Sequence, residues 1–326
     1  MVRKIIYSSL FLSLFSLGGL AQDTAEIARH ATEKSPGFFD FLVMPQFITK
    51  YVVMIIIALL AFALLKTRKM QSGIKVLILV ISTLLFGIAG NFVAVFAMHP
   101  SPMCAVEKSM LFGFRIPMII TLAVILLLTF VGPRLFCGWV CPVGAVQELV
   151  AMLADRLNLK RIKYNFILAN GIRIGIFLAF LFLSVTMVLT FTHEGRVFPL
   201  SIYNYINAFH GFEFGAQPSA LDYVINFLPL VLSLVLAFKL YRPFCHLVCP
   251  IGMVTHFTEQ FSLYKIRLKT DACTDCGICV KKAPCPAMPE ILKSATLRPD
   301  CFACNVCLDV CPEDALDVGL QRTIRS

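Results

Sequence analysis

Charged residues are scarce in this sequence. Of its 326 residues 15% are charged and 58% are hydrophobic, whereas about a quarter of the residues of a soluble domain are charged. This composition excludes an ordinary soluble domain and predicts a membrane protein. The sequence also contains no Gly-rich nucleotide loop, no Ser-His-Asp order and no c-type haem motif. It therefore offers no pattern for nucleotide binding, serine hydrolysis or covalent haem attachment.

Acidic residues are also few, so the chain is basic. Its 29 Lys and Arg against 19 Asp and Glu give a net charge of +10. A basic balance can indicate nucleic-acid binding, but these basic residues lie between long apolar runs and not on one soluble face. We therefore expect no nucleic-acid partner and interpret the basic residues as signals of membrane topology.

The first 46 residues predict a short apolar segment and a linker. Arg3 and Lys4 precede an apolar run that ends in small residues, so residues 1–21 resemble a secretory signal peptide. An uncleaved short helix is the alternative, because a full span needs roughly 20 residues. Residues 22–46 are polar and are expected as a linker on the outer face.

Residues 47–263 predict an α-helical membrane domain of five spans. The apolar segments that carry this prediction are 47–65, 76–97, 116–131, 166–191 and 221–240. The connections at 66–75 and 132–164 are rich in Lys and Arg, whereas the alternate connections are poor in them. By the positive-inside rule the basic connections and the C-terminal residues face the cytoplasm. The sequence therefore predicts a multi-pass protein of the bacterial inner membrane, surrounded by lipid.

One pattern occurs twice, at the ends of the third and fifth expected spans. Arg134-Leu-Phe-Cys137-Gly-Trp-Val-Cys141-Pro aligns with Arg242-Pro-Phe-Cys245-His-Leu-Val-Cys249-Pro. We call residues 134–146 and 242–254 the two C-x3-C-P repeats. An amphipathic stretch follows each repeat and is expected to lie along the inner membrane interface.

The last sixty residues contain eight cysteines in two runs. The second run follows the C-x2-C-x2-C-x3-C-P spacing of bacterial ferredoxins with Cys301, Cys304, Cys307 and Cys311. The first run has five residues where three are usual before its last cysteine, and consists of Cys273, Cys276, Cys279 and Cys285. Structural zinc sites usually combine separated C-x2-C pairs, which this pattern does not. Residues 264–326 are therefore expected as a small α+β domain of bacterial-ferredoxin type with two 4Fe-4S clusters.

Two ligand sets follow, because the fourth cysteine of each run crosses to the other cluster in two-cluster ferredoxins. Site A consists of Cys273, Cys276, Cys279 and Cys311. Site B consists of Cys285, Cys301, Cys304 and Cys307. Clusters need reduced thiolates, so the domain is expected in the reducing cytoplasm, in agreement with the loop charges.

The four cysteines of the C-x3-C-P repeats leave three interpretations open. Residues i and i+4 share one helix face, so Cys137 with Cys141, and Cys245 with Cys249, are each expected to present two thiols in one direction. The parallel repeats would let both pairs converge on one redox site, because four thiolates are a complete ligand set for an iron–sulfur cluster. Two separate dithiols and a purely structural Cys-Pro helix break are the alternatives.

Paired C-x3-C-P motifs on membrane helices, combined with a C-terminal two-cluster ferredoxin, resemble the membrane polyferredoxin family of the NapH and NosR type. The resemblance covers roughly residues 116–320. It implies a membrane-bound iron–sulfur electron-transfer protein between the quinone pool, or a cytoplasmic donor, and a partner reductase. Such a protein is an electron carrier or a subunit of a quinol dehydrogenase, and quinone is a further candidate ligand. A maturation factor that supplies reducing equivalents for another metalloprotein is the alternative of a different class.

Arg173 is a charged residue near the inner end of the fourth expected span, and no neighbouring span supplies a carboxylate near that end. A charge within a membrane is a functional hypothesis by default, and here it could face the thiolates or a quinone oxygen. Snorkelling of the side chain to the inner headgroups is the alternative.

Overall fold

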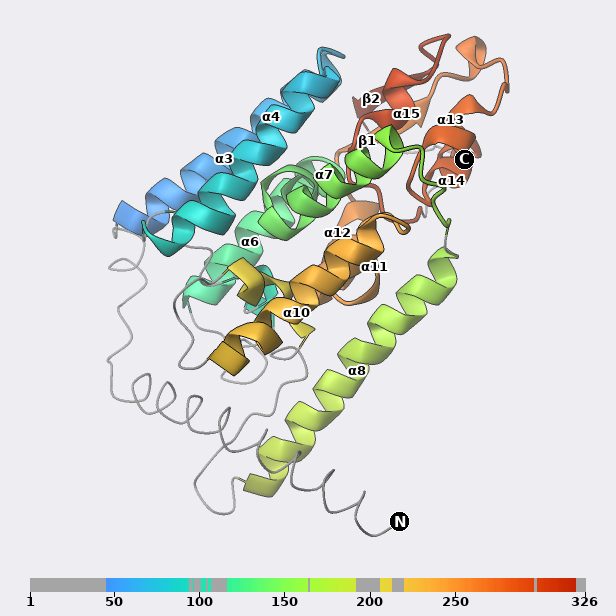
Figure 1. The fold of residues 1–326 in the computed structure, drawn as a ribbon. Helices are drawn as coiled ribbons and strands as arrows, with labels where there is room; N and C mark the ends of the chain where they lie inside the picture. The colour runs from blue at the N-terminus through green and yellow to red at the C-terminus, as the bar shows by residue number, and fades with distance from the viewer. Residues whose placement is uncertain are drawn as a thin grey trace.

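The computed structural model describes residues 45–93, 96, 101–103, 105–106, 116–163, 165–191, 206–212, 220–295 and 298–320. The expected signal-like segment 1–21 and nearly all of the linker 22–46 lie outside the described residues. Figure 1 shows long helices with the C-terminal residues gathered at one end.

Every apolar segment expected as a span forms a helix. The helices are α3 (Pro45–Lys66), α4 (Ser72–Ser82), α6 (Ile116–Val131), α8 (Phe166–Phe191) and α10 (Ala220–Ala237). Helix α4 continues through a π-helical turn, Thr83–Ile88, and a 3-10 turn, Ala89–Asn91. The helical prediction is confirmed.

Among the residues whose side chains the structure describes, two helical stretches, Ile48–Lys66 and Ser72–Asn91, are long and apolar enough to cross a membrane. Within the same residues the apolar parts of α6, α8 and α10 are shorter. Apolar side chains also lie on the outside of the helices. Val52 and Ile56 on α3 are 46% and 57% exposed, and Ile167 on α8 is 79% exposed. Soluble monomers rarely expose large apolar surfaces. This surface favours contact with lipid.

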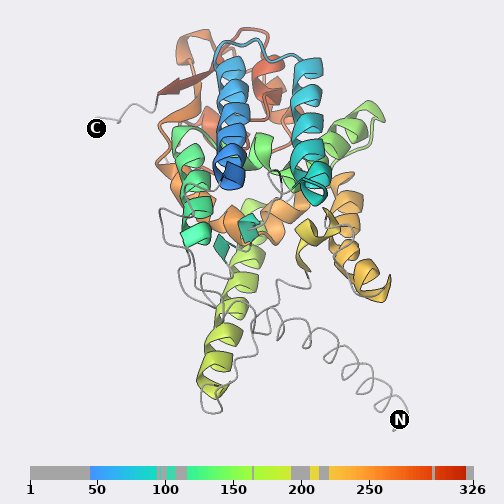
Figure 2. The same cartoon turned by 90° about the vertical axis from the view of Figure 1, so that its left-hand side faces the viewer.

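Each C-x3-C-P repeat folds as a short helical turn, a break and a second helix. In the first repeat the turn is Phe136–Val140 and the helix is α7 (Pro142–Arg156). In the second the turn is α11 (Pro243–Leu247) and the helix is α12 (Pro250–Gln260). Helix α7 packs on α4 and α10, and α12 packs on α6 and α8. Figure 2 shows α3 and α4 running side by side in front of this region.

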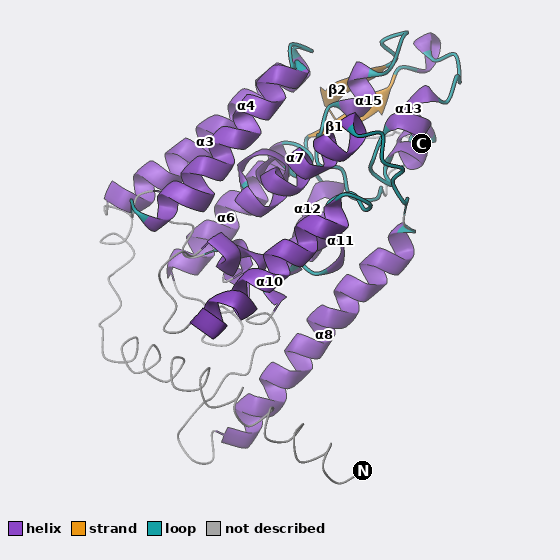
Figure 3. Cartoon of the chain, viewed as in Figure 1, coloured by secondary structure: helices purple, strands orange, loops and turns teal. Residues whose placement is uncertain are grey.

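Residues 264–320 form a small unit of short helices and one strand pair. Strands β1 (Tyr264–Leu268) and β2 (Leu316–Leu320) are antiparallel, with Tyr264 opposite Leu320. The helices α13 (Ile278–Lys282), α14 (Met288–Leu292) and α15 (Val306–Asp309) lie between them in sequence. Figure 3 shows the strand pair together with α13 and α15 at one end of the molecule. The strand pair joins the two ends of this C-terminal unit, so both cysteine runs lie within one closed segment.

One hydrophobic core connects the C-terminal unit with the helical part. It extends from Met54 on α3 through Trp139 in the first repeat to Phe302 in the second cysteine run. The C-terminal unit is therefore packed against the repeats and does not hang on a flexible linker. This packing fixes the position of site B relative to the repeats.

Candidate redox sites

The two cysteine runs share an unusual backbone conformation. Asp275 and Gly277 have φ angles of 52° and 69°, and the equivalent Ala303 and Asn305 have φ angles of 49° and 71°. Glycine and asparagine tolerate this left-handed region better than other residues. Alternating left- and right-handed residues turn successive amide N–H groups to one side, which forms an anion-binding nest. Both loops therefore have the same backbone arrangement for holding an anionic group.

Site A brings together cysteines from both runs. One cavity is bordered by Cys273, Cys276 and Cys279 of the first run and by Cys311 of the second run. The sulfur of Cys311 also accepts a hydrogen bond of 3.3 Å from the backbone N–H of Ala315. The four ligands expected for one cluster thus border the same cavity.

Site B is buried. Its four cysteines are each less than a tenth exposed. Burial, followed by the negative charge of Cys304, raises the pKa of the Cys285 thiol to about 12. Burial also raises the pKa of Cys301, and the negative charge of Cys285 is the second largest cause of this increase. The crossing cysteine of the first run therefore lies among the thiols of the second run.

Among the described residues, no three His, Cys, Asp or Glu side chains are close enough to hold one metal ion. Thiolates around a single ion approach one another to about 4 Å. An iron–sulfur cluster contains sulfide of its own and holds its cysteines further apart.

The two cysteines of each C-x3-C-P repeat do not lie in one continuous helix. Cys137 and Cys245 belong to the short turns, whereas Cys141 and Cys249 cap α7 and α12 with extended backbone, φ −64° with ψ 120° and ψ 119°. The expectation that each pair shares one helix face is therefore wrong. Proline disfavours a helical residue before it and suits the first position of a helix, so each repeat breaks at its second cysteine.

A glycine three residues after each capping cysteine closes the repeat. A Cβ on Gly144 or Gly252 would collide with the carbonyl oxygen of the first cysteine of the same repeat. Because nothing larger than glycine fits, the chain folds back tightly at this point. The backbone N–H of Gly144 then donates to the Cys141 thiol, and that of Gly252 donates to Cys249. Each thiol thus lies at a helix N-terminus, where negative charge is favoured.

The first residue of each repeat reaches into the other repeat. Arg242 donates to the carbonyl oxygens of Cys137 at 2.7 Å and Gly138 at 3.1 Å. Arg134 donates to the carbonyl oxygen of Gly252 at 2.9 Å. Both arginines have a left-handed backbone, with φ of 44° and 48°, which is strained for a non-glycine residue. The sequence analysis missed this exchange, although the arginine at the same position of both repeats was a signal for it.

One buried carboxylate joins the C-terminal unit to the helical part. Asp300 is fully buried and pairs with Arg134 and with Arg173, whose Nη1 lies 3.0 Å from Oδ2. The Nδ1 atoms of His256 and His246 lie 2.9 and 3.2 Å from its carboxylate oxygens. Burial raises the pKa of Asp300, but Arg134, the two histidines and Arg173 outweigh burial and hold the pKa well below its usual range. Asp300 is therefore ionised and is the counter-charge of two buried arginines.

Arg173 therefore has a carboxylate partner, which lies in the C-terminal unit and not in a neighbouring span. Its side chain is fully buried and donates to Asn170 Oδ1 at 2.6 Å and to the carbonyl oxygen of Cys245 at 3.3 Å. Snorkelling to the headgroups is wrong for this residue. Asp300 is 127 residues away in the sequence, so no local pattern could have indicated the pair.

The loop of site B lies directly on the repeats. The guanidinium groups of Arg134 and Arg242 lie 5.1 and 4.7 Å from the centre of the Phe302 ring. Lys75 donates to the carbonyl oxygen of Cys304 at 2.9 Å. Three cations thus surround the site B loop on the side that faces the helices.

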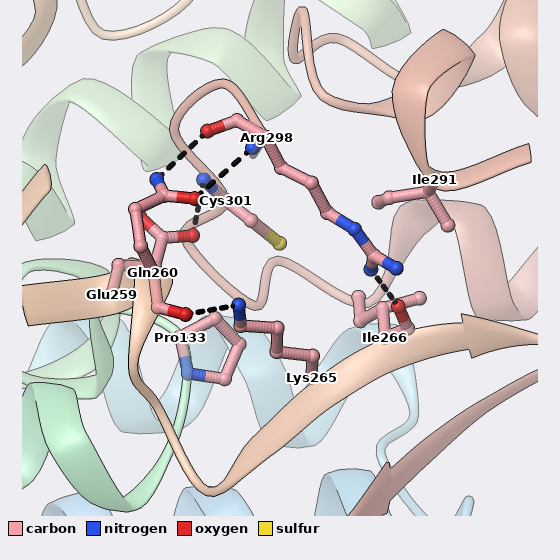
Figure 4. A pocket seen from close by; sticks show the side chains of 8 residues that line it. All are labelled: Pro133, Glu259, Gln260, Lys265, Ile266, Ile291, Arg298 and Cys301. Carbon is pink, nitrogen blue, oxygen red and sulfur yellow. Dashed lines mark hydrogen bonds between the residues drawn. The ribbon is translucent and has the colours of Figure 1, made fainter. Parts of the chain in front are cut away.

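Glu259 of α12 holds the beginning of the same loop. Its Oε1 accepts the backbone N–H of Cys301 at 2.9 Å, and its Oε2 lies 2.8 Å from Nε of Arg134. Next to it, Gln260 both donates to and accepts from the backbone of Arg298, as Figure 4 shows. Helix α12 therefore belongs to the second repeat and also positions a ligand of site B.

Glu148 of α7 balances a second pair of buried cations. Its carboxylate oxygens lie 2.5 Å from Lys75 Nζ and 3.0 Å from Arg242 Nε. Burial raises its pKa, but the charges of Lys75 and Arg242 outweigh burial and lower the pKa of Glu148 to about 2.

We expect Glu148→Gln to destabilise the protein by about 3 kcal/mol at pH 7, because each pKa unit corresponds to about 1.4 kcal/mol. The pKa of Glu148 in the folded protein lies below the ordinary glutamate value of 4.5. The stabilisation is therefore complete above pH 4.5 and is lost as the pH falls towards 2. The difference in thermal midpoint between the wild type and Glu148→Gln should become smaller below pH 4.5. Glu290→Gln, which removes an exposed partner of Lys293, is the control and should change the midpoint little. Equal thermal midpoints of the wild type and Glu148→Gln at pH 7 would contradict the role of Glu148 as the counter-charge of Lys75 and Arg242.

The two repeats lie in segments that resemble a known protein family. A family described as a 4Fe-4S binding domain matches residues 114–160 and 224–269. Each match contains one C-x3-C-P repeat and ends before the cysteine runs of sites A and B. No solved structure matches the chain.

Relatives come from bacteria and an archaeon. An uncharacterized protein of Methanocaldococcus jannaschii is 31% identical over 68% of the chain and 87% of its own length. The putative electron transport protein YccM of Escherichia coli is 26% identical over 64% of the chain and 58% of YccM. The ferredoxin-type protein NapH of Haemophilus influenzae is 29% identical over 58% of the chain and 63% of NapH. The chain thus spans less than two thirds of YccM and of NapH.

The fold, the cysteine sites and these matches define a membrane-associated iron–sulfur electron-transfer protein of the ferredoxin type. The chain belongs to the NapH family of membrane ferredoxin-type proteins. The family expected from the sequence is confirmed.

Proposed function

We propose that the protein passes electrons between the quinone pool, or a cytoplasmic donor, and a partner redox protein. The observation that carries this proposal is the burial of the site B loop against the C-x3-C-P repeats. Asp300 and Phe302, which flank Cys301 in the sequence, are both fully buried there. An electron at site B would thus be separated from the helical part by packed side chains and not by solvent.

Sites A and B are the proposed ligand sets of two 4Fe-4S clusters. Such a cluster, when bound, accepts and releases electrons at a potential that its surroundings set. The nest-like backbone of each loop directs N–H groups to the anionic group. Around site B, Arg134, Arg242 and Lys75 stabilise negative charge, which favours the reduced state. Site A lies in the more exposed run, since Cys276 is exposed, and suits exchange with a soluble partner.

The proposed topology has five spans with both sites on the cytoplasmic side. The two basic connections expected inside both touch the C-terminal unit. Arg68 pairs with Asp314, and Lys163 donates to the carbonyl oxygen of Val280. The connections and the C-terminal unit therefore lie on the same side, which supports the orientation derived from loop charge.

Electron exchange with quinol in sealed vesicles tests both parts of the proposal. The protein, purified without oxygen and reconstituted, should change its cluster absorbance when a quinol or quinone analogue is added. A membrane-impermeant reductant should reduce sites A and B in inverted vesicles and leave them oxidised in right-side-out vesicles; protein-free vesicles are the control. Clusters that exchange no electrons with either analogue would contradict the quinone role and favour the maturation factor. Equal reduction in both vesicle types would contradict the topology.

A further inference from the structure

We propose that site B exchanges electrons with the helical part at one contact, where Phe302 lies against both C-x3-C-P repeats. Phe302 directly follows Cys301, a proposed ligand of site B. Gly138 of the first repeat and His246 of the second are the residues that position it. The inference deepens the proposed function and rests on it for the electron-transfer role.

Phe302 contacts both repeats at the same position. Gly138 follows Cys137 in the first repeat, and His246 follows Cys245 at the equivalent place in the second. A Cβ on Gly138 would collide with the carbonyl oxygen of Phe302, so only glycine leaves room for the loop of site B. The rings of Phe302 and His246 meet edge to face, with 5.1 Å between their centres. Phe302 therefore touches the neighbour of the first cysteine in each repeat.

The first arginine of each repeat also holds Phe302. The guanidinium groups of Arg242 and Arg134 lie 4.7 and 5.1 Å from the centre of its ring, which is within the range of cation–π attraction. Arg242 at the same time donates to the carbonyl oxygens of Cys137 and Gly138. Phe302 is only 1% exposed. The contact is therefore dry and is fixed from both repeats.

The loop of site A has no equivalent of this side chain. Thr274 follows Cys273 in the first run, as Phe302 follows Cys301 in the second, and Thr274 is exposed. If cluster binding required an aromatic residue at this position, both loops would need one. The aromatic side chain is therefore explained by the contact of site B with the repeats.

The contact connects two cysteines with one residue on either side of it. From Cys301 the path runs through the backbone of Phe302, crosses to Gly138 and reaches Cys137. The repeats lie in the segments that match the 4Fe-4S family, and their four cysteines are a complete ligand set for an iron–sulfur group. One electron leaves site B, which is oxidised by one unit, and enters that group, which is reduced by one unit. No bond changes and no proton is required.

Gly138→Ala tests the contact, because the added methyl group must push the loop of Phe302 away from the first repeat. Purified protein is mixed with dithionite without oxygen, frozen at successive times and followed by electron paramagnetic resonance. We expect the iron–sulfur signal of the repeats, identified by its loss in a Cys137→Ser, Cys245→Ser double variant, to appear several-fold more slowly. Reduction of site A should keep its rate, because dithionite reaches the exposed Cys276 without crossing the contact.

A second measurement separates this role from simple packing. The reduction potential of site B should fall in Gly138→Ala, because the loop moves away from the charges of Arg134 and Arg242, while the potential of site A stays the same. A contact that only stabilises the fold would lower the thermal midpoint and leave the rate and both potentials unchanged.

Two further variants complete the experiment. Gly175→Ala on α8 is the matched control, since a Cβ at this glycine meets nothing within 4 Å, and it should behave as the wild type. Phe302→Leu keeps a buried apolar side chain but loses the ring contacts with His246 and both arginines, and it should slow the same step. If Gly138→Ala retains no clusters, Phe302→Leu decides the question.

An unchanged rate at the repeats, in a variant that keeps the signals of sites A and B, would overturn the proposal. Reduced wild-type protein without a signal from the repeats would overturn it as well, since the electron would then have no acceptor there. The outcome is separate from the proposed function, because dithionite is the only reductant used. Failure to exchange electrons with a quinone analogue would leave this experiment unaffected.

Discussion

Replacing Asp300 by Asn should loosen the C-terminal unit from the helical part of the protein. The side chain keeps its shape but loses its charge, which leaves Arg134 and Arg173 buried without this counter-charge. Removal of one partner of a buried ion pair costs about 3–5 kcal/mol. We expect a lower thermal midpoint and faster cleavage by added protease between the helices and the C-terminal unit.

Asp317→Asn is the matched control. It is the same substitution in the same unit, but Asp317 and its partner Arg267 are partly exposed, so about 1 kcal/mol or less is at stake. The signal of site A should survive in both variants. If Asp300→Asn has the same thermal midpoint and the same cleavage rate as the wild type, the ion-pair network does not hold the C-terminal unit in place.

Replacing Cys311 by Ala should remove the cluster of site A, whose other three cysteines belong to the first run. Cys311 borders the cavity of site A together with Cys273, Cys276 and Cys279. We therefore expect the loss of about four iron atoms per chain and of one spectroscopic signal, while the signal of site B remains.

Cys285→Ala is the reciprocal variant, because Cys285 lies among the thiols of the second run. It should remove the signal of site B and leave that of site A. Anaerobic redox titration followed by electron paramagnetic resonance distinguishes the two signals. If Cys311→Ala instead removes the signal of site B and leaves that of site A, the crossed assignment is wrong.

The helices and the cysteine runs could be predicted because their signals are local. A long apolar segment in a membrane forms a helix because its backbone groups must be hydrogen-bonded within the segment, and ligand spacing in a run such as Cys301 to Cys311 is set by one loop. The break at Cys141 was also local, and the prediction failed there because the helical period was applied across Pro142. The conformational effect of proline on the preceding residue was the stronger signal.

The ion-pair network could not be predicted from the sequence. The carboxylate that pairs with Arg173 was sought in the neighbouring spans, but Asp300 comes from a unit that follows all of them. Likewise, Arg134 and Arg242 were recognised as part of a repeat, whereas the exchange of their side chains depends on how the repeats face each other. Such contacts are decided by tertiary packing.

The position of Asp300 near the end of the sequence has a consequence for biogenesis. During synthesis Arg134 and Arg173 enter the membrane region long before their counter-charge has been made. Until the second cysteine run folds and docks, the helical part therefore lacks the Asp300 partner of Arg173 and one of the two carboxylate partners of Arg134. We expect this run to fold around its proposed cluster, so iron supply should control completion of the molecule. Iron-starved cells should therefore contain less of the protein, because proteases remove the incomplete form.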